Sequence, residues 1–430
     1  MTEAADIETD ALSALAPAGR EAFAQARAGG KRPLDALGSV AARDLPLKDP
    51  VFAEVERAGP PALTPPDGFA TLVLIAKLTR HCNLRCTYCN DWREGPGQQM
   101  TPRTQVLMLR RAAEDARAAT LKFVWHGGEP SLLGVRRTLG FLWLQARLRR
   151  PGQMVRNSLQ TNGVGLTDEM IALWKLFGVR ASVSLDGPRE MHDRTRRTVA
   201  DTPSFDAAAD GIGRLKAAGL FAGALVVVTE EIAALDPLYL VDALEAAGVD
   251  AAAFLPVRPS SADGSGPCLA PEAFARFLVR LLDALRAHPD RRLAVRELDA
   301  LHAAYQGTGT GFCELRGPCL GDYFGVDPDG QVMHCDKFLG SDAHVLGTLA
   351  ERSFAEMRAS TEMRALKDRY RAAQTRLAAC KWFGRCKGWC PHEAHIADLR
   401  GTAGGCCGLA EVFAHFARLE ADARREAAHA

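Results

Sequence analysis

Residues 71–305 show a regular rhythm in which short, β-rich apolar runs alternate with longer amphipathic stretches. The predicted strands are 72–78, 121–125, 156–160, 180–185, 221–228 and 251–257. The helical patterns between and after them are 102–119, 133–150, 167–177, 204–218, 237–247 and 271–287. Strands that alternate with helices of this length indicate an α/β class built from βα units on a parallel sheet. Six units are fewer than the eight of a closed barrel, so we predict an open, partial (βα)6 barrel with its chemistry at the carboxyl ends of the strands.

The chain changes character on both sides of this rhythm. Helical patterns at 7–28 and 50–58 are followed by prolines between 60 and 66, which indicates a mostly helical extension that ends in a linker, part of it mobile. Beyond the barrel, 307–335 is rich in Gly, Pro, Asp and Cys, and helices are predicted at 353–373 and 409–427. The predicted domains are an N-terminal extension at 1–70, a partial barrel at 71–305 and a cysteine-rich domain at 306–430.

Composition narrows the class of protein. The chain has 430 residues and a net charge of +1, from 53 Lys and Arg against 52 Asp and Glu, which gives no electrostatic reason to expect nucleic acid or a membrane as partner. The acidic N-terminus lacks the pattern of a secretory signal, and the longest apolar runs are too short to span a bilayer. We therefore expect a cytoplasmic protein. Of its 12 cysteines all but Cys268 are clustered, which favours metal or catalytic roles over disulfides.

Three cysteines follow the first predicted strand in the sequence TRHCNLRCTYCN. Cys82, Cys86 and Cys89 are separated by three and then two residues. Three thiolates on one tight loop can bind three irons of a cubane and leave the fourth iron open. A structural zinc site with His81 as the fourth ligand is the alternative. The spacing, its place after a strand and Tyr88 before the last cysteine resemble the radical S-adenosylmethionine (radical SAM) superfamily.

This resemblance implies an enzyme, a radical SAM oxidoreductase. A [4Fe–4S] cluster on the three cysteines would reduce SAM, which splits to methionine and a 5′-deoxyadenosyl radical that removes a hydrogen atom from a C–H bond. The cofactor carries this chemistry, while the protein positions it and excludes side reactions.

Motifs after the next three strands resemble the SAM pocket of the same superfamily. HGGEP, QTNG and SLDGP follow the second, third and fourth strands, and HDRTR lies shortly after. The implied SAM-binding residues are Gly127, Gly128 and Glu129 at the methionine ammonium, Ser184 and Arg196 at its carboxylate, and Gln160 and Asp186 toward the adenosyl group or substrate. Arg194 or Arg197 could replace Arg196, and Asp186 could simply be a turn residue.

The C-terminal cysteines resemble the SPASM extension, which carries two auxiliary [4Fe–4S] clusters, so the cofactors would be three [4Fe–4S] clusters and SAM. The implied ligands of the first auxiliary cluster are Cys313, Cys319, Cys335 and Cys390. Those of the second are Cys380, Cys386 and one of the Cys406/Cys407 pair, with Cys407 closer to the usual spacing. The sequence departs from the pattern at Leu377, where a further cysteine is usual, so the second cluster has three protein ligands, takes both adjacent cysteines or takes another residue.

Two further features complete this region. A zinc-ribbon-like knot is the alternative for the whole set of C-terminal cysteines, and Cys268 stands alone as a free thiol. The sequence DPDG at 327–330 predicts a hairpin turn just before Cys335.

The substrate class follows from the SPASM resemblance, which implies a peptide- or protein-modifying enzyme. Our first hypothesis is a maturase that crosslinks or oxidises side chains of a ribosomally made precursor peptide, giving for example a thioether or a cyclophane. The alternative is a sulfatase-maturing enzyme, which converts Ser or Cys to formylglycine. Asp336, directly after Cys335, resembles the candidate catalytic base of those enzymes, but the loop after Cys89 lacks their Cys-Tyr-Tyr run. A non-catalytic electron carrier or zinc scaffold is a third class, disfavoured by the intact cysteine loop beside HGGEP.

The implied partners are the precursor peptide and an electron donor such as flavodoxin or ferredoxin. Residues 1–70 lack the β-hairpin of a winged-helix leader-binding domain, which leaves leader recognition to a separate protein or to another surface.

Iron content tests the cofactor prediction. Three cubanes require about twelve irons per chain in the fully reconstituted protein. Iron, sulfide and zinc analysis of anaerobically prepared protein measures this, and about four irons with two tightly bound zinc ions would identify the C-terminal knot as a zinc module.

Overall fold

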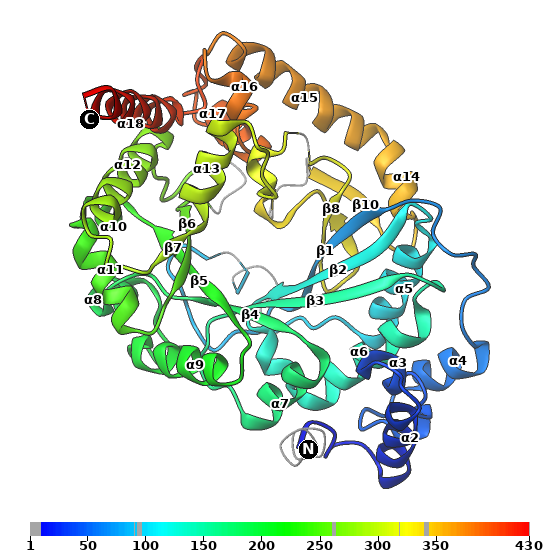
Figure 1. Ribbon diagram of the computed structural model, residues 1–430. Helices are drawn as coiled ribbons and strands as arrows, with labels where there is room; N and C mark the ends of the chain where they lie inside the picture. Colours follow the sequence, from blue (N-terminus) through cyan, green and yellow to red (C-terminus); the bar gives the residue numbers. More distant parts are fainter. Residues whose placement is uncertain are drawn as a thin grey trace.

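The computed structural model describes residues 10–89, 91–92, 97–259, 264–317, 319–338 and 344–429. Its centre is one curved sheet of ten strands in the order β10-β9-β8-β1-β2-β3-β4-β5-β6-β7, with helices outside it (Figure 1). The strands are β1 (Ala70–Thr79), β2 (Ala118–Gly127), β3 (Met154–Thr161), β4 (Arg180–Ser184), β5 (Phe221–Val228), β6 (Ala251–Pro256), β7 (Ala294–Val295), β8 (Tyr323–Val326), β9 (Gln331–Met333) and β10 (Val345–Thr348).

Strands β1 to β7 pair in parallel with their neighbours, which confirms the partial barrel and all six predicted strands. The outer helices of this part are α5 (Pro102–Glu114), α6 (Gly134–Leu148), α7 (Asp168–Phe177), α8 (Arg189–Thr195), α9 (Phe205–Ala217), α10 (Glu230–Ala234), α11 (Pro237–Ala246), α12 (Pro271–Ala287) and α13 (Arg296–Gln306). The predicted helix at 102–119 was too long. It ends at Glu114 because the next segment enters β2. In β2 every second side chain, those of Leu121, Phe123 and Trp125, points into the core.

The N-terminal extension packs against the outside of the barrel. Helices α3 (Pro33–Leu37) and α4 (Pro50–Ala58) pack on α6, and α2 (Pro17–Ala28) packs on α3 (Figure 1). The buried rings of Phe52 and Trp143 meet edge to face at 5.7 Å, and Trp143 Nε1 donates to the carbonyl of Val40 at 2.9 Å. Gly140 makes room for this contact, because a Cβ there would lie 2.9 Å from Phe52. The described part of the extension, residues 10–58, therefore packs on the barrel. The helix predicted at 7–28 was too long: α2 begins only at Pro17, because Ala16 before this proline takes an extended backbone, and residues 7–9 lie outside the described residues.

The cysteine-rich region continues the same sheet. Strand β8 pairs in parallel with β1, and β9 returns antiparallel to β8. The predicted turn at 327–330 joins β8 and β9, with the N–H of Gly330 donating to the carbonyl of Asp327 at 2.9 Å. The helix predicted at 353–373 is two helices, α14 (Phe354–Ala359) and α15 (Thr361–Leu377), because Ser360 takes an extended backbone and caps the second one.

The remaining C-terminal helices close the open side of the barrel. Helices α16 (Phe383–Cys386) and α17 (Pro391–Leu399) lie between the two ends of the curved sheet, and α18 (Ala410–His429) packs on α12 (Figure 1). No helix among the described residues is long and apolar enough to cross a membrane.

The Phe52 contact gives a stability prediction. Phe52→Ala should lower the free energy of unfolding by about 3–5 kcal/mol, since it leaves a cavity between α4 and α6. Thermal unfolding of the two proteins measures the loss. Phe69→Ala is the matched control, because Phe69 is 99% exposed and its removal should leave the melting temperature almost unchanged. Equal melting temperatures of the Phe52→Ala and Phe69→Ala variants would show that the extension is only loosely attached.

Candidate active site

The cysteine loop leaves the carboxyl end of β1. Cys86 is buried, whereas Cys82 and Cys89 are partly buried. Burial raises the pKa of Cys82 to about 12 and that of Cys89 to about 11, and the neighbouring thiols of the loop add to both shifts. Backbone N–H groups nevertheless face the sulfurs, such as that of Leu84, 3.4 Å from Cys82 Sγ. Three largely buried thiols that influence one another electrostatically fit a cluster whose positive iron ions keep them deprotonated.

Two glycines bring the end of β2 against this loop. A Cβ at Gly127 would lie 2.1 Å from the carbonyl oxygen of Thr79, and one at Gly128 would lie 2.2 Å from that of His81. Gly127 also has φ +115°, which disfavours any side chain. The N–H of Gly128 donates to the Thr79 carbonyl at 2.7 Å, and the N–H of Glu129 donates to that of His81 at 2.7 Å. The predicted SAM-binding glycines therefore also fix the position of the cysteine loop.

Glu129 joins the ends of β2 and β3. Its side chain is fully buried and accepts hydrogen bonds from the N–H of Ser131 at 3.0 Å, from Thr161 Oγ1 at 2.8 Å and from the N–H of Asn162 at 2.7 Å. Burial raises the pKa of Glu129, and these donors oppose the rise. The carboxylate is a positioning group in this structure, and its role at the methionine ammonium remains a prediction.

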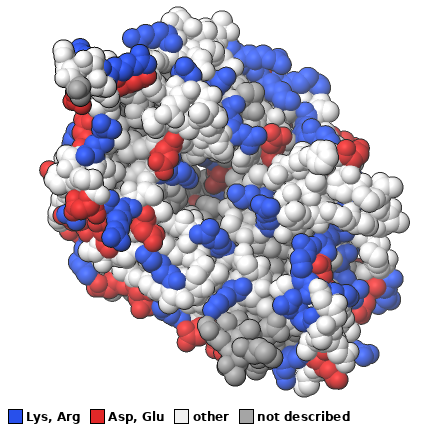
Figure 2. Space-filling model, viewed as in Figure 1, with Lys and Arg blue, Asp and Glu red and all other residues white. Residues whose placement is uncertain are grey.

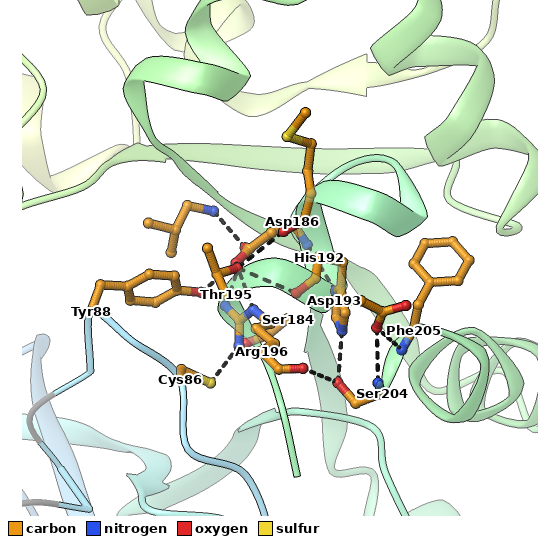
Figure 3. Close-up of polar contacts among 12 residues, drawn as sticks. Cys86, Tyr88, Ser184, Asp186, His192, Asp193, Thr195, Arg196, Ser204 and Phe205 are labelled. Atoms are coloured by element: carbon orange, nitrogen blue, oxygen red, sulfur yellow. Dashed lines mark hydrogen bonds and ion pairs between the residues drawn. The ribbon is translucent and has the colours of Figure 1, made fainter. Parts of the chain in front are cut away.

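A buried ion pair lies at the end of β4 (Figure 3). Arg196 Nε is 2.8 Å from Asp186 Oδ2, and the N–H of Val227 on β5 donates to Asp186 Oδ1 at 2.9 Å. Burial disfavours the charge on Asp186, but Arg196 outweighs burial and lowers the pKa of this carboxyl group. Tyr88 of the cysteine loop donates its hydroxyl to Asp186, and Arg196 Nη1 lies 3.9 Å from Cys86 Sγ. Asp186 therefore connects Arg196, the cysteine loop and β5 through its carboxylate, and is more than a turn residue.

His192 supports this pair and was missed by sequence reasoning. Its Nδ1 accepts the N–H of Asp186 at 3.3 Å, and its Nε2 faces Ser204 Oγ at 3.0 Å (Figure 3). Burial lowers the pKa of His192 to about 4, so the ring is neutral near pH 7, with the proton on Nε2. The segment HDRTR was singled out in the sequence for its arginines, but a histidine six residues after an aspartate carries no signal by itself.

The other two predicted residues of the pocket lie next to each other. Gln160 at the end of β3 donates its Nε2 to Ser184 Oγ at the end of β4, at 2.9 Å. The structure therefore brings the strand-end motifs together along one edge of the sheet, as the parallel topology predicts.

A charged cavity of about 230 Å³ lies beside the cysteine loop, where the barrel meets the cysteine-rich region. Its walls include Lys77, Tyr88, Asp91, Arg258 and Asp336. Lys77 Nζ is 2.6 Å from Asp91 Oδ1. Lys77, Asp91 and Arg258 were not predicted from the sequence, although a lysine inside the apolar run of β1 was a visible signal.

Asp336 reaches this cavity from the cysteine-rich region. Its Oδ2 lies 3.8 Å from Nε2 of His126, whose Nδ1 lies 3.8 Å from Asp91 Oδ2. Burial opposes ionisation, but His126 and Lys77 hold the pKa of Asp336 below its usual value. The group is therefore a carboxylate at neutral pH, placed at a cavity wall, which is the state that a proton acceptor requires.

The cysteines predicted for the first auxiliary cluster come together from three segments. Cys319 lies within electrostatic range of Cys313 and of Cys390, and Cys390 lies within range of Cys335. Cys335 has φ +63°, an unusual conformation for a residue with a side chain, directly before Asp336. Among the described residues, no three His, Cys, Asp or Glu side chains surround one point as ligands of a single ion do. Four thiols from three segments are the type and number of donors that a [4Fe–4S] cluster takes.

Cys380, Cys386, Cys406 and Cys407 form a second group, and Cys268 stays apart, 3.9 Å from Arg258 Nη1. The group contains every cysteine that the sequence predicts for the second auxiliary cluster, and their role as its ligands remains a prediction.

Family models match both halves of this site. The model of the radical SAM superfamily matches residues 76–233, and that of the SPASM iron-sulfur cluster-binding domain matches residues 318–387. The serine-type anaerobic sulfatase-maturating enzyme of Klebsiella aerogenes is 30% identical over 342 residues, which are 77% of this chain and 82% of the relative. The chain belongs to the radical SAM superfamily. It is an enzyme whose cofactors are SAM and [4Fe–4S] clusters.

Other proteins are similar to most of this chain. The cysteine-type anaerobic sulfatase-maturating enzyme of Clostridium novyi is 26% identical over 77% of this radical SAM chain and 90% of its own length. The solved structure of anSMEcpe with bound AdoMet and Cp18Cys peptide has a TM-score of 0.72 at 23% identity and covers 83% of this chain and 99% of its own. SuiB of Streptococcus suis, bound to its precursor peptide SuiA, has a TM-score of 0.53 at 15% identity over 80% of this chain and 77% of its own. Both structures show the same fold.

The cysteine loop gives a direct prediction for this radical SAM enzyme. Replacing Cys82, Cys86 and Cys89 together with Ala should abolish SAM cleavage while about eight of about twelve irons remain, because only one cubane loses its ligands. The measurements are 5′-deoxyadenosine formation under dithionite and bound iron. Cys268→Ala is the control and should retain both, whereas unchanged 5′-deoxyadenosine from the triple variant would contradict the assignment.

Proposed function

We propose that the enzyme is a radical SAM/SPASM maturase that abstracts hydrogen from a side chain of a ribosomally made precursor peptide and thereby forms a crosslink or an oxidised residue. One observation carries the proposal. The charged cavity has walls from both halves of the site, with Tyr88 of the cysteine loop on one side and Asp336 of the SPASM region on the other. A substrate side chain in this cavity would lie between the radical source and an auxiliary centre.

The residues around the cavity would hold the reacting side chain and accept a proton from it. The SAM-bound cluster supplies the radical that removes hydrogen. The Lys77–Asp91 pair is nearly fully buried and fixes one wall, and His126 lies between Asp91 and Asp336. Asp336, a carboxylate 25% exposed, could accept a proton from the substrate. Arg258 and Glu393, buried and paired with each other, form the wall toward the SPASM helices.

Access for a peptide supports the proposal. Figure 2 shows a hollow near the middle of the face that looks into the barrel, with Lys and Arg side chains around it. Two solved structures with this fold hold a peptide, Cp18Cys in anSMEcpe and the precursor SuiA in SuiB. We place the enzyme in the cytoplasm, with flavodoxin or ferredoxin as electron donor and with leader recognition by a separate protein or another surface.

Sulfatase maturation is the second candidate function. This chain matches most of the length of the sulfatase-maturating relatives. It also has an acid, Asp336, directly after Cys335, which resembles their candidate base. Mass alone does not separate the two functions for a serine substrate, since crosslinking and oxidation to formylglycine both remove two hydrogens. A hydrazide probe does, because it labels the formylglycine aldehyde and not a crosslink. Incubating the enzyme with candidate precursor peptides and with sulfatase-derived peptides, followed by this probe, tests both functions.

Asp336 gives the sharpest mutational prediction. Asp336→Asn keeps the shape and removes the basic carboxylate, so the variant should still cleave SAM and exchange hydrogen with the peptide. Product should fall by roughly 100-fold or more, as for loss of a general base. Asp322→Asn, at an exposed carboxylate of the same region, is the control and should have wild-type yield. Wild-type yield from Asp336→Asn would reduce Asp336 to a structural residue.

A further inference from the structure

We propose that the adjacent residues Cys406 and Cys407 both ligate the second auxiliary cluster, so that Cys406 supplies the ligand which the SPASM pattern places at Leu377. The complete ligand set is then Cys380, Cys386, Cys406 and Cys407. This inference rests on the [4Fe–4S] cofactors of the proposed maturase, but not on the identity of its substrate.

The thiols of the adjacent pair face two different partners. Cys406 Sγ lies 4.0 Å from Cys380 Sγ, and Cys407 Sγ lies 3.6 Å from Cys386 Sγ. The two contacts belong to one group of thiols, because Cys386 is near enough to Cys380 to raise the pKa of its thiol. Both members of the pair therefore face another cysteine of the same group.

Backbone amides provide a second, independent observation. The N–H of Gly388 donates to Cys386 Sγ at 3.4 Å. For the other three cysteines, the backbone N–H two positions later, in Trp382, Gly408 or Leu409, acts to lower the pKa of the thiol. Cys82 of the SAM cluster loop and Cys335 of the first auxiliary set accept from Leu84 and Lys337 in the same way. Hydrogen bonds to cysteinyl sulfur stabilise the thiolate that an iron–sulfur cluster requires. Cys406 therefore has the backbone environment of a ligand, as its neighbour has.

The loop that carries the pair is held rigidly. Gly408 has φ +90°, and a Cβ there would lie 2.3 Å from Pro271 at the start of α12, so the loop is pressed against this helix. Gly404 and Gly405 come directly before the pair. Because they have no side chains, nothing of theirs separates the loop from α15. This closeness lets two successive thiols project toward Cys380 and Cys386.

Leu377 lies close enough to the adjacent pair for a cysteine at this position to be tested as a replacement ligand. It ends α15, its carbonyl accepts the N–H of Cys380 at 3.0 Å, and it lines a cavity of about 230 Å³ together with Cys406 and Cys407. A cysteine at 377 would therefore enter the surroundings of the proposed cluster without a change in the loop.

The experiment compares single and compensating variants of the full-length, anaerobically reconstituted enzyme. We expect Cys406→Ala and Cys407→Ala each to lower bound iron from about twelve toward about eight per chain, with matching loss of sulfide and of one reduced EPR signal. Leu377→Cys in the Cys406→Ala background should restore both. Cys268→Ala is the matched control and should keep the full iron content.

The outcomes separate this inference from its alternatives. Full iron and an unchanged EPR spectrum in Cys406→Ala would overturn it and leave Cys407 as the single ligand of the pair. The rescue by Leu377→Cys cannot result from a general folding defect, because it adds a thiol only where the ligand is missing. Retention of 5′-deoxyadenosine formation in the variants shows that the SAM cluster is intact. Failure to modify any peptide, with the iron pattern as expected, would reject the proposed function and keep the ligand set.

A measurement on the unmodified enzyme covers the case in which both single variants fail to fold. With SAM present to occupy the open iron of the first cluster, imidazole is added to the reduced protein. An auxiliary cluster with four cysteines has no free iron, so its EPR signal should not shift. An imidazole-dependent shift of an auxiliary signal would reveal an open iron and overturn the proposal.

Discussion

The close contact between the ends of β1 and β2 is the constraint on which the active site depends. Gly127 and Gly128 let the backbone of the cysteine loop approach so closely that no side chain fits between, and the amides of Gly128 and Glu129 bond to its carbonyls. The loop is therefore not free to place its thiols independently of the pocket for SAM. Glu129, which continues from Gly128, and the Asp186–Arg196 pair, which the loop residue Tyr88 contacts, are positioned relative to this contact.

Much of the barrel could be predicted because its signals are local. Buried strands read as apolar runs, and motifs at their ends converge at one edge because the sheet is parallel. The cysteine loop, Gly127 to Glu129 and the pair Gln160 and Ser184 were found in this way. The C-terminal strands were not, since β8 to β10 are three or four residues long and join the sheet through β1, far away in the sequence.

The residues that the sequence did not reveal act through partners distant along the chain. Lys77 has no evident role in the sequence until Asp91 is seen beside it, and His126 gains a role only between Asp91 and Asp336. Asp186 was predicted to face the substrate region, but the structure shows it bound to Arg196, Tyr88 and the amide of Val227. Spacing identifies which residues are special, whereas the pairing of charges depends on three-dimensional proximity.

The parallel pairing of β8 with β1 has a consequence for the spacing between two of the cysteine segments. Strand β1 leads into the SAM cluster loop, and the hairpin that begins with β8 leads to Cys335, so both ligand segments extend from neighbouring, hydrogen-bonded strands. The separation of the two centres is then set by strand register, which changes only in steps of a residue and turns side chains over when it does. Loops elsewhere in the molecule can then vary while the spacing between these two cysteine segments stays the same.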